Sequence, residues 1–389
     1  MRLLFFQLQQ QSYESYTYFS ESLAAEFRKN GHETRFFRAA EEPLQNMERF
    51  SGESFDAVID FNSNLPKLRM EDHRYFLDTI HAPFFNVILD HPLYHHDSLK
   101  QNLTNYHVVC LDWNHKAYLE TYYPHIRSVN VIPMTGSAAS PTVPFSDRRI
   151  PLLFTGSYTS PEEVLDALSH IPPFMQENVH ALIELCTRNP KLPIEAAAQQ
   201  LFQGTVVTEL FPLHMQSFFL ADTYLRAKTR HDLLQILLEA ELPIRICGNG
   251  YEKAPFFNQS SGIFMRERPF SETFALMSQA KITLNLMPGF KAGAHDRIFS
   301  AMLNGSVALT DGSAWISRHL SPTKNILLYS LSDLPSLPVQ IREALADERM
   351  LRSIAAEGQK EAVRCHTWAN RCLQLEQIIS QFSWDSVPQ

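Results

Sequence analysis

The sequence lacks the features of several protein classes. It has only five cysteines in 389 residues and no C-x-x-C pair, which argues against a disulfide framework or a zinc site. No stretch approaches the roughly 18 apolar residues that a membrane-spanning helix needs. The apolar run in residues 1–6 is too short for a secretory signal. We therefore expect a cytoplasmic protein without a transmembrane segment.

Positive charge is also scarce. The chain carries 34 Lys and Arg against 42 Asp and Glu, a formal net charge of −8 at pH 7. Nucleic-acid-binding domains normally present a basic face, so nucleic acid is not an expected partner. A single basic pocket is still compatible with this charge, because net charge says little about one cleft. Nothing in the pattern indicates an oligomeric state.

Short apolar runs alternate with amphipathic stretches along most of the chain. Alternating strands and helices favour parallel sheets joined by right-handed crossovers, and the chain is long enough for two such domains. The expected strands are Arg2–Phe6, Glu33–Phe37, Ala57–Phe61, Phe84–Leu89, Val108–Leu111, Val129–Ile132, Leu152–Phe154, Ile244–Cys247, Ile282–Leu286, Val307–Thr310 and Ile326–Tyr329.

These elements predict a division of the chain into four parts. Residues 1–138 form a Rossmann-like acceptor-side domain, and residues 139–150 are a linker, because the small residues from 136 to 141 show no apolar period. Residues 151–368 form a second Rossmann-like domain, with a helical insertion at about 161–240 that is too long for one crossover helix. Residues 369–389 form a helix that returns to the first domain. The predicted fold class is α/β, with two doubly wound parallel sheets facing a cleft.

The most informative stretch is Ala280–Asp311, where a strand leads through a glycine-containing loop into a helix. The start of a helix offers free N–H groups and a positive dipole end, which suit a phosphate. Lys291, His295 and Arg297 converge there. Asp296 stands where an N-cap or a hydroxyl acceptor is wanted. The alternative is that Asp296 only caps the helix and Arg297 makes a surface ion pair.

This stretch resembles the signature of the CgeB-like glycosyltransferases, relatives of the group-1 glycosyltransferases with the GT-B fold. The residues that carry the resemblance are Ala280, Lys281, Asn285, His295–Gly305 and Leu309–Asp311, with further similarity at Leu153–Ser157, Arg245–Tyr251, Ile354–Gly358, His366–Arg371 and Leu89–Tyr94. The resemblance implies a GT-B glycosyltransferase without a cofactor or a required metal ion. Its donor would be a UDP-sugar or another NDP-sugar, and its acceptor a protein, a glycan or a surface precursor. The Asp-x-Asp motif of the metal-using architecture is absent from the sequence.

The resemblance also implies where the donor binds. The expected contacts are the strand-end loops and the start of the helix, at Gly156, Ser157, Gly248, Asn249, Gly250, Tyr251, Lys291, Gly293, His295, Asp296, Ser300 and Asp311. Negative charge develops on the leaving diphosphate, and cationic side chains aimed at it stabilise the transition state. We expect Arg297 to be the catalytic cation, with Lys291 beside it.

The sequence departs from the group-1 pattern at two places. Two glutamates eight positions apart are replaced by Ala292 and Ser300. Asp296 lies one turn before Ser300 on the same helical face, so it is the candidate for the ribose hydroxyls. The basic pair after the first strand of the second domain is also missing, since residues 157–160 follow Gly156. These losses keep open a catalytically inactive glycan- or partner-binding module. A nucleotide-sugar epimerase is a third hypothesis, for which no pair of carboxylates is evident.

An inverting enzyme needs a general base, and we expect it in the first domain. Asp90 and His91 stand at a predicted strand end and are the candidates, and Asp60 stands at another. The alternative is a solvated histidine-rich loop in which Pro92 fixes a turn. The run His95–Asp97 does not predict a metal site, because adjacent histidines do not share a helical face.

Overall fold

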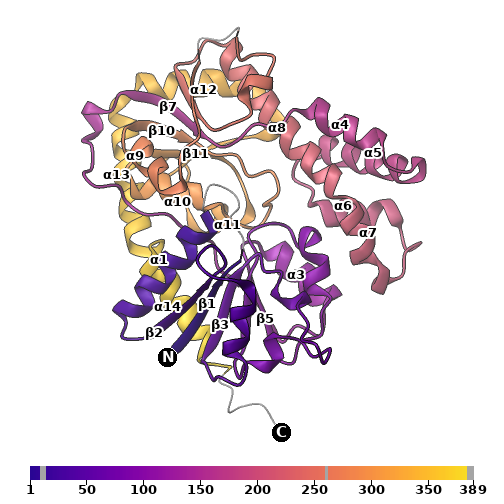
Figure 1. The fold of residues 1–389 in the computed structure, drawn as a ribbon. Helices are drawn as coiled ribbons and strands as arrows, with labels where there is room; N and C mark the ends of the chain where they lie inside the picture. The colour runs from indigo at the N-terminus through magenta and orange to yellow at the C-terminus, as the bar shows by residue number, and fades with distance from the viewer. Residues whose placement is uncertain (9–14, 259–261, 383–389) are drawn as a thin grey trace. The chain divides into compact units, whose positions relative to one another are not determined.

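The computed structural model describes residues 1–8, 15–258 and 262–382 (Figure 1). The chain divides into two compact units. The first comprises Met1–Met134 and Trp368–Gln389, and the second comprises Thr135–Thr367. The predicted linker, residues 139–150, therefore lies inside the second unit. Residues 383–389 of the predicted C-terminal segment fall outside the described part.

The first unit contains a six-stranded parallel sheet of order β2-β1-β3-β4-β5-β6. Its strands are β1 (Arg2–Gln7), β2 (Glu33–Arg38), β3 (Ala57–Phe61), β4 (Phe84–Val87), β5 (Tyr106–Cys110) and β6 (Ser128–Val131). Parallel strands need crossover connections. These contain α1 (Ser15–Lys29), α2 (His96–Leu99), α3 (Trp113–Tyr122) and the 3-10 helices η1 (Leu44–Phe50), η2 (Leu65–Lys67), η3 (Leu77–Thr79) and η4 (Pro92–His95).

The last helix of the chain belongs to this first unit. α14 (Trp368–Ile379) lies beside α1 in Figure 1. Asn30, at the end of α1, donates a hydrogen bond to Glu376 over 3.3 Å. The ring of Trp368 packs 5.6 Å from that of Phe19. Residues from the two ends of the sequence thus share one core.

The second unit contains another six-stranded parallel sheet, of order β12-β11-β10-β7-β8-β9. Its strands are β7 (Ile150–Thr155), β8 (Ile244–Cys247), β9 (Ile263–Met265), β10 (Ala280–Leu284), β11 (Val307–Asp311) and β12 (Leu327–Tyr329). The sequence-based assignment missed β9, whose three residues are exposed or half-buried and give no buried apolar run. The two sheets confirm the predicted fold class.

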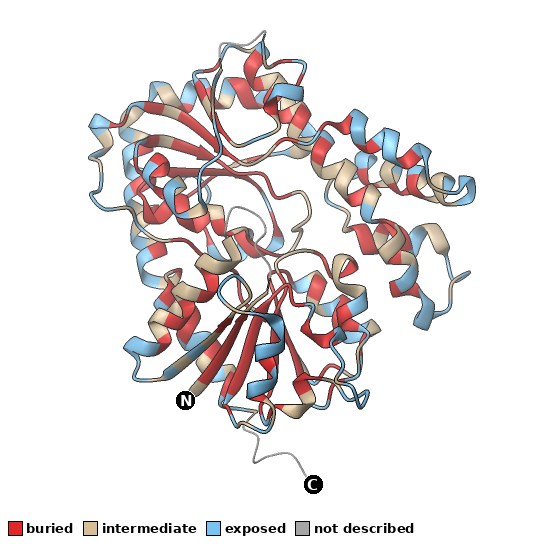
Figure 2. Cartoon of the chain, in the orientation of Figure 1, coloured by how far each residue is buried: buried red, intermediate tan, exposed pale blue. Residues whose placement is uncertain are grey.

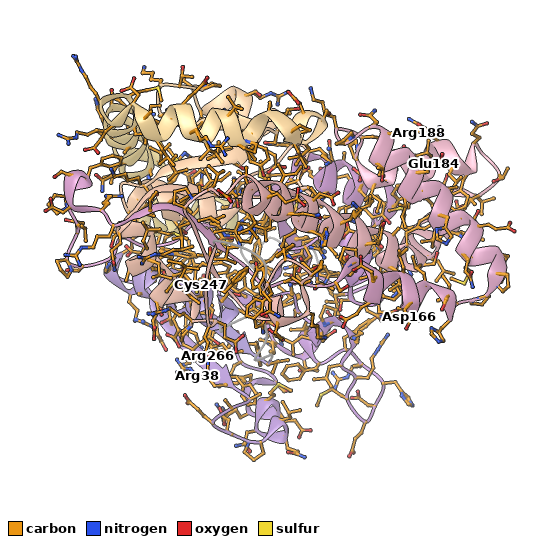
Figure 3. All side chains as sticks on the ribbon, turned by 90° about the horizontal axis from the view of Figure 1, so that it is seen from above. Arg38, Asp166, Glu184, Arg188, Cys247 and Arg266 are labelled. Carbon is orange, nitrogen blue, oxygen red and sulfur yellow. The ribbon has the colours of Figure 1, made fainter. Side chains whose placement is uncertain are left out.

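Helices occupy the long segment between β7 and β8. They are α4 (Pro161–Ser169), α5 (Pro173–Arg188), α6 (Ile194–Phe202), η6 (Thr208–Leu210), α7 (Phe211–Ser217) and α8 (Phe219–Glu239). They form the helical insertion that the sequence predicts. In Figure 3 Asp166, Glu184 and Arg188 lie on this insertion, where Glu184 and Arg188 form an exposed ion pair within one turn of α5.

The other helices of the second unit connect or cover its strands. They are η5 (Phe145–Asp147), η7 (Tyr251–Lys253), η8 (Phe270–Glu272), α9 (Thr273–Ser278), α10 (Asp296–Leu303), α11 (Ala314–His319), η9 (Leu331–Ser336), α12 (Leu337–Ala346) and α13 (Glu348–Cys365).

The central strands of each sheet are buried along their length (Figure 2). In β7, residues Leu152, Leu153 and Phe154 are at most 1% exposed. Strands covered on both faces are apolar runs without alternation, which is why short apolar runs located them in the sequence.

The small residues at 136–141, from which the linker was predicted, pack against α10. The amide of Ala139 donates to the side chain of Asn304 over 2.7 Å, and that side chain donates to the carbonyl of Ser137 over 2.9 Å. A Cβ added at Gly136 would overlap the hydroxyl of Ser300. Small residues occur here because the backbone passes close to a helix, so their lack of apolar period does not indicate a loose connection.

Candidate functional site

The second sheet has a topological switch point between β7 and β10. These two strands are neighbours, but the chain runs from β7 to β8 and β9 on one side and from β10 to β11 and β12 on the other. In open α/β sheets, ligands bind outside the carboxyl ends of the strands at such a point. Thr155 ends β7, and Asn285 follows β10 directly. The side chains around these two residues therefore form the candidate site.

Arg297 joins the two strand ends at the switch point. Its Nε donates to the hydroxyl of Thr155 over 3.0 Å, and its Nη1 donates to the side-chain oxygen of Asn285 over 3.0 Å. Its third nitrogen, Nη2, would lie 3.7 Å from a Cβ added at Gly156. Burial lowers the pKa of Arg297, but a guanidinium remains protonated in proteins. A fixed positive charge therefore stands beside the turn that follows β7.

A network of polar side chains holds Arg297 in place from the other strands. The Asn285 amide nitrogen donates to Thr310 Oγ1 over 2.8 Å, and the Tyr329 hydroxyl donates to the Asn285 carbonyl over 2.9 Å. Asp311 accepts from the amide of Met287 over 2.9 Å. Burial raises the pKa of Asp311 to about 6. Satisfied buried networks rigidify their surroundings, so the guanidinium is preorganised.

The turns after β7 and β8 interlock through glycines. A Cβ added at Gly248 would overlap the carbonyl oxygen of Gly156. A Cβ added at Gly250, whose φ is 79°, would overlap the carbonyl oxygen of Tyr158. The hydroxyl of Tyr251 donates to the carbonyl of Gly156 over 2.7 Å. Tyr251 is 2% exposed, so the structure gives it the role of holding the Gly156 turn.

The remaining residues predicted in these turns contribute backbone groups. The carbonyl of Asn249 accepts from the amide of Tyr158 over 2.9 Å, and that of Ser157 accepts from Arg230 over 2.7 Å. Cys247, the last residue of β8, lies close to Arg266 in Figure 3, and its thiol donates to the carbonyl of Arg266 over 3.3 Å. The exposed side chain of Asn249 extends from this edge.

The start of α10 differs in one respect from the sequence-based expectation. The N-cap is His295, and Asp296 is the first residue of the helix. In a neutral His295 ring Nδ1 accepts from the amide of Arg297 over 3.2 Å, whereas a protonated ring instead pairs with Asp296, 3.1 Å away. The fully buried hydroxyl of Ser300 donates to the carbonyl of Asp296 over 2.9 Å. His295 therefore caps α10, and Asp296 lies in the first turn of the helix without capping it.

Lys291 and Gly293 make contacts beside the switch point. The amine of Lys291 donates to the carbonyl of Pro190, in the insertion, over 2.6 Å. The carbonyl of Gly293 accepts from the hydroxyl of Ser313. A cavity of about 370 Å³ lies on this side, with Lys291 and Asp311 in its wall. Ser313 and Tyr329 also line it. Tyr329 was not among the residues predicted for the site, although it ends a strand, and the rule of strand ends located Asp311.

In the first unit, His91 and Asp90 have local structural contacts. His91 is the N-cap of η4, and its Nδ1 accepts from the amide of Leu93 over 3.0 Å. A neutral imidazole has one acceptor nitrogen, so its proton-accepting position is engaged. Asp90 accepts from the side chain of Asn62 over 3.1 Å. The assignment of either residue as a general base stays a prediction.

Two other titratable groups of the first unit are strongly perturbed. Burial lowers the pKa of His95 to about 4, so this ring is neutral at pH 7. Within the described part of the chain its Nε2 has no hydrogen-bond partner. Burial also raises the pKa of Asp60, at the end of β3, to about 7, although the amide of Phe61 donates to it over 2.8 Å.

The raised pKa of Asp60 predicts how stability depends on pH. The folded state keeps a proton that the unfolded chain releases near pH 4, so the free energy of unfolding should fall by about 1.4 kcal/mol per pH unit between roughly pH 4 and pH 7. Asp60→Asn should remove that contribution. Urea unfolding of both proteins at pH 5 and pH 8 measures it. An unchanged pH dependence in the variant would show that Asp60 does not hold the proton.

The described residues contain neither a metal-binding cluster nor a membrane-spanning helix. Within residues 1–8, 15–258 and 262–382, no group of three or more His, Cys, Asp or Glu side chains is arranged to hold a metal ion. Among the helices of the same part of the chain, none has the length and apolarity to cross a membrane.

The fold is that of known glycosyltransferases. An alpha-glucosyltransferase solved in complex with UDP matches with a TM-score of 0.58 at 11% identity, over 98% of this chain and 100% of the other. AviGT4, a glycosyltransferase involved in avilamycin A biosynthesis, matches with a TM-score of 0.53 at 12% identity, over 100% and 99%. Sucrose-phosphate synthase from Thermosynechococcus elongatus matches with a TM-score of 0.53 at 10% identity, over 98% of each chain. These likenesses establish the GT-B fold.

Sequence comparison agrees for the C-terminal part of the chain. Residues 227–377 match a family model described as "Glycosyl transferase-like". This part of the chain thus matches a glycosyltransferase-like family domain, which confirms the resemblance stated from the sequence. No curated protein matches the chain significantly.

Proposed function

We propose that this protein transfers a sugar from a nucleotide-sugar donor to a glycan or protein acceptor, without a divalent metal ion. The observation that carries the proposal is Arg297. Its guanidinium is held at the switch point by Thr155 and Asn285, and Nη2 points toward the turn at Gly156. This is a cation fixed where ligands of such sheets bind.

The geometry suits the chemistry of glycosyl transfer. When the bond between the anomeric carbon and the diphosphate breaks, negative charge grows on the leaving phosphate. A preorganised cation and the positive end of α10 stabilise that charge without reorganisation. Gly156 has no side chain, so a phosphate can approach its backbone closely.

The donor nucleotide is proposed from the structural neighbours. Alpha-glucosyltransferase structures of this fold were solved with UDP and with UDP-glucose and DNA, so UDP is the first nucleotide to test. Asp296 is the proposed partner of the ribose hydroxyls, because the hydroxyl of Ser300 is fully buried and already bonded to the helix backbone.

Thermal unfolding with nucleotides tests this proposal. In buffer with EDTA, UDP, GDP, TDP or CMP is added at about one hundred times a micromolar Kd. Binding of one nucleotide stabilises the protein by roughly 2.7 kcal/mol, which should raise the melting temperature of a chain of this length by roughly 3 °C. Release of free UDP from UDP-glucose then distinguishes a transferase from a binding module. A melting temperature unchanged by all four nucleotides would contradict the proposal.

A further inference from the structure

One tryptophan of the first unit lies exposed beside the carboxyl edge of its sheet. Of the three tryptophans in the described part of the chain, Trp315 and Trp368 are buried, whereas Trp113 is 47% exposed. It is the first residue of α3 and follows closely on Cys110, the last residue of β5. Single exposed apolar side chains are common on protein surfaces, so the surroundings of this indole decide whether it has a role.

The start of α3 restricts the orientation of the Trp113 ring. Asp112 is fully buried and caps the helix, since its Oδ1 accepts from the amide of Asn114 over 2.7 Å. One turn further on, the amine of Lys116 lies 5.7 Å from the centre of the indole ring and donates to the carbonyl of Val129 over 2.7 Å. A cation at this distance is attracted to the face of the ring. An exposed ring that is already held loses little freedom when a ligand packs against it.

A second contact ties the start of α3 to the end of β4. The buried ring of His115 packs 4.7 Å from that of His91, which directly follows Asp90. The carboxyl ends of β3, β4 and β5 lie side by side, and neighbouring strands are about 4.8 Å apart, so these three ends span about 10 Å. The row begins at the switch point of the first sheet, between β1 and β3. Ligands of open α/β sheets bind outside such carboxyl ends.

Asp90 supplies an oriented carboxylate to this row. The side chain of Asn62 donates to Asp90 Oδ2 over 3.1 Å and to the hydroxyl of Tyr16 over 2.7 Å, and it accepts from the amide of Leu89 over 2.8 Å. Asn62 has a φ of 45°, in the left-handed region where asparagine is enriched among residues other than glycine. A carboxylate accepts several hydrogen bonds, so half-buried Asp90 can accept from a ligand hydroxyl while Asn62 holds it.

The groups of this row match the surface of a sugar ring. Asn64, after β3, is exposed and makes no side-chain cap bond to η2, so its amide offers donors and an acceptor. A pyranose ring has C–H groups on its faces and hydroxyls around its rim. The C–H groups pack against the negative face of an indole, and the hydroxyls pair with carboxylate and amide groups. Asn64, Asp90 and Trp113, together called the acceptor edge, provide all of these partners.

We propose that the acceptor edge binds the second substrate, and that this substrate is an oligosaccharide, one ring of which stacks on Trp113. The inference rests on the proposed function, because it states which of the two acceptor classes the transferase uses. Trp113 determines specificity by holding a sugar ring and takes no part in breaking the donor bond. Stacking on an indole needs no charge on the glycan, so a neutral oligosaccharide is a sufficient ligand.

Binding of the full chain to saccharides and peptides tests the inference. The labelled protein is applied, with and without UDP, to an array of defined oligosaccharides and to an array of peptides. Calorimetry then measures the affinity for the neutral oligosaccharide that binds best. The expected result is that Trp113→Ala weakens this binding by about tenfold or more, and that Trp113→Phe, which keeps an aromatic face, weakens it less. The matched control is Leu373→Ala, which truncates another exposed apolar side chain of the first unit and should leave the affinity unchanged.

The outcomes separate this inference from the proposed function. Binding to peptides alone, no binding to any saccharide, or a saccharide affinity unchanged by Trp113→Ala would overturn the acceptor edge. Saccharide binding that added salt abolishes would also overturn it, because salt screens charges and leaves stacking intact. The UDP-induced rise in melting temperature, measured on the same variants, reports on the donor site and on folding, and Trp113→Ala should preserve it. A UDP response without saccharide binding therefore overturns only the acceptor inference, whereas saccharide binding without any nucleotide response contradicts the proposed transferase.

Discussion

Replacing Arg297 with alanine is expected to abolish the UDP-induced rise in melting temperature and to slow donor cleavage by about 100-fold or more. Loss of one preorganised donor to a developing oxyanion typically costs roughly 2.7–4 kcal/mol of transition-state stabilisation. Arg297 supplies both a charge and the donor that points toward Gly156. The measurements are thermal unfolding with and without UDP, and release of UDP from UDP-glucose.

The variant also changes the protein without ligand, and controls must account for this. Thr155 and Asn285 each lose a partner, which costs about 1–3 kcal/mol for a buried polar group left unsatisfied. Arg297→Lys keeps the positive charge, but a lysine amine cannot hydrogen-bond to both Thr155 and Asn285 and also offer a donor to the phosphate. We therefore expect an intermediate loss of affinity for UDP. Arg318→Ala, at an exposed site on α11, should behave as wild type. UDP binding that survives Arg297→Ala undiminished would place the phosphates elsewhere.

Gly248→Ala is expected to be the most destabilising small substitution in the site. The added methyl group would meet the carbonyl of Gly156, which is backbone and has no rotamer to change. Overpacking costs about 1–3 kcal/mol and occasionally more, and contact with backbone belongs to the upper end. The melting temperature should fall by roughly 3 °C or more. The UDP response should also shrink, because the Gly156 turn would move.

Gly289→Ala provides the comparison. Gly289 also lies in a loop after a strand of the second sheet, but an added Cβ there has no heavy atom within 4 Å. Its melting temperature should stay close to that of the wild type. Equal stability of the two variants would show that the turns after β7 and β8 are not packed as described.

The sheets were predictable because buried parallel strands appear in the sequence as short apolar runs. Leu152–Phe154 and Ile244–Cys247 are such runs, and both are strands. Ile263–Met265 is also an apolar run, but its three residues lie at the sheet edge and are exposed or half-buried, and the sequence-based assignment missed this strand. The insertion was recognisable from length, because no crossover between adjacent parallel strands needs so many helical residues.

The site could be predicted only where local sequence determines position. The local strand-loop-helix pattern is enough to place Arg297 at the start of α10. The pattern does not reveal that Tyr251 bonds to Gly156 or that Lys291 reaches Pro190, because these contacts join residues about 100 positions apart. The sequence suggested Asp296 as the N-cap of α10, whereas the structure has His295 in that place. The difference is one residue, which is within the usual uncertainty of a helix boundary.

Photoaffinity labelling with a UDP-sugar that carries an azide on its base, followed by peptide mapping, locates the donor site. We expect labelled peptides within Thr135–Thr367, from the loops after β7, β8 or β10. Excess UDP should prevent labelling, and Arg297→Ala should abolish it. Label confined to Met1–Met134, or label that persists in the variant, would contradict a donor site at the switch point of the second sheet.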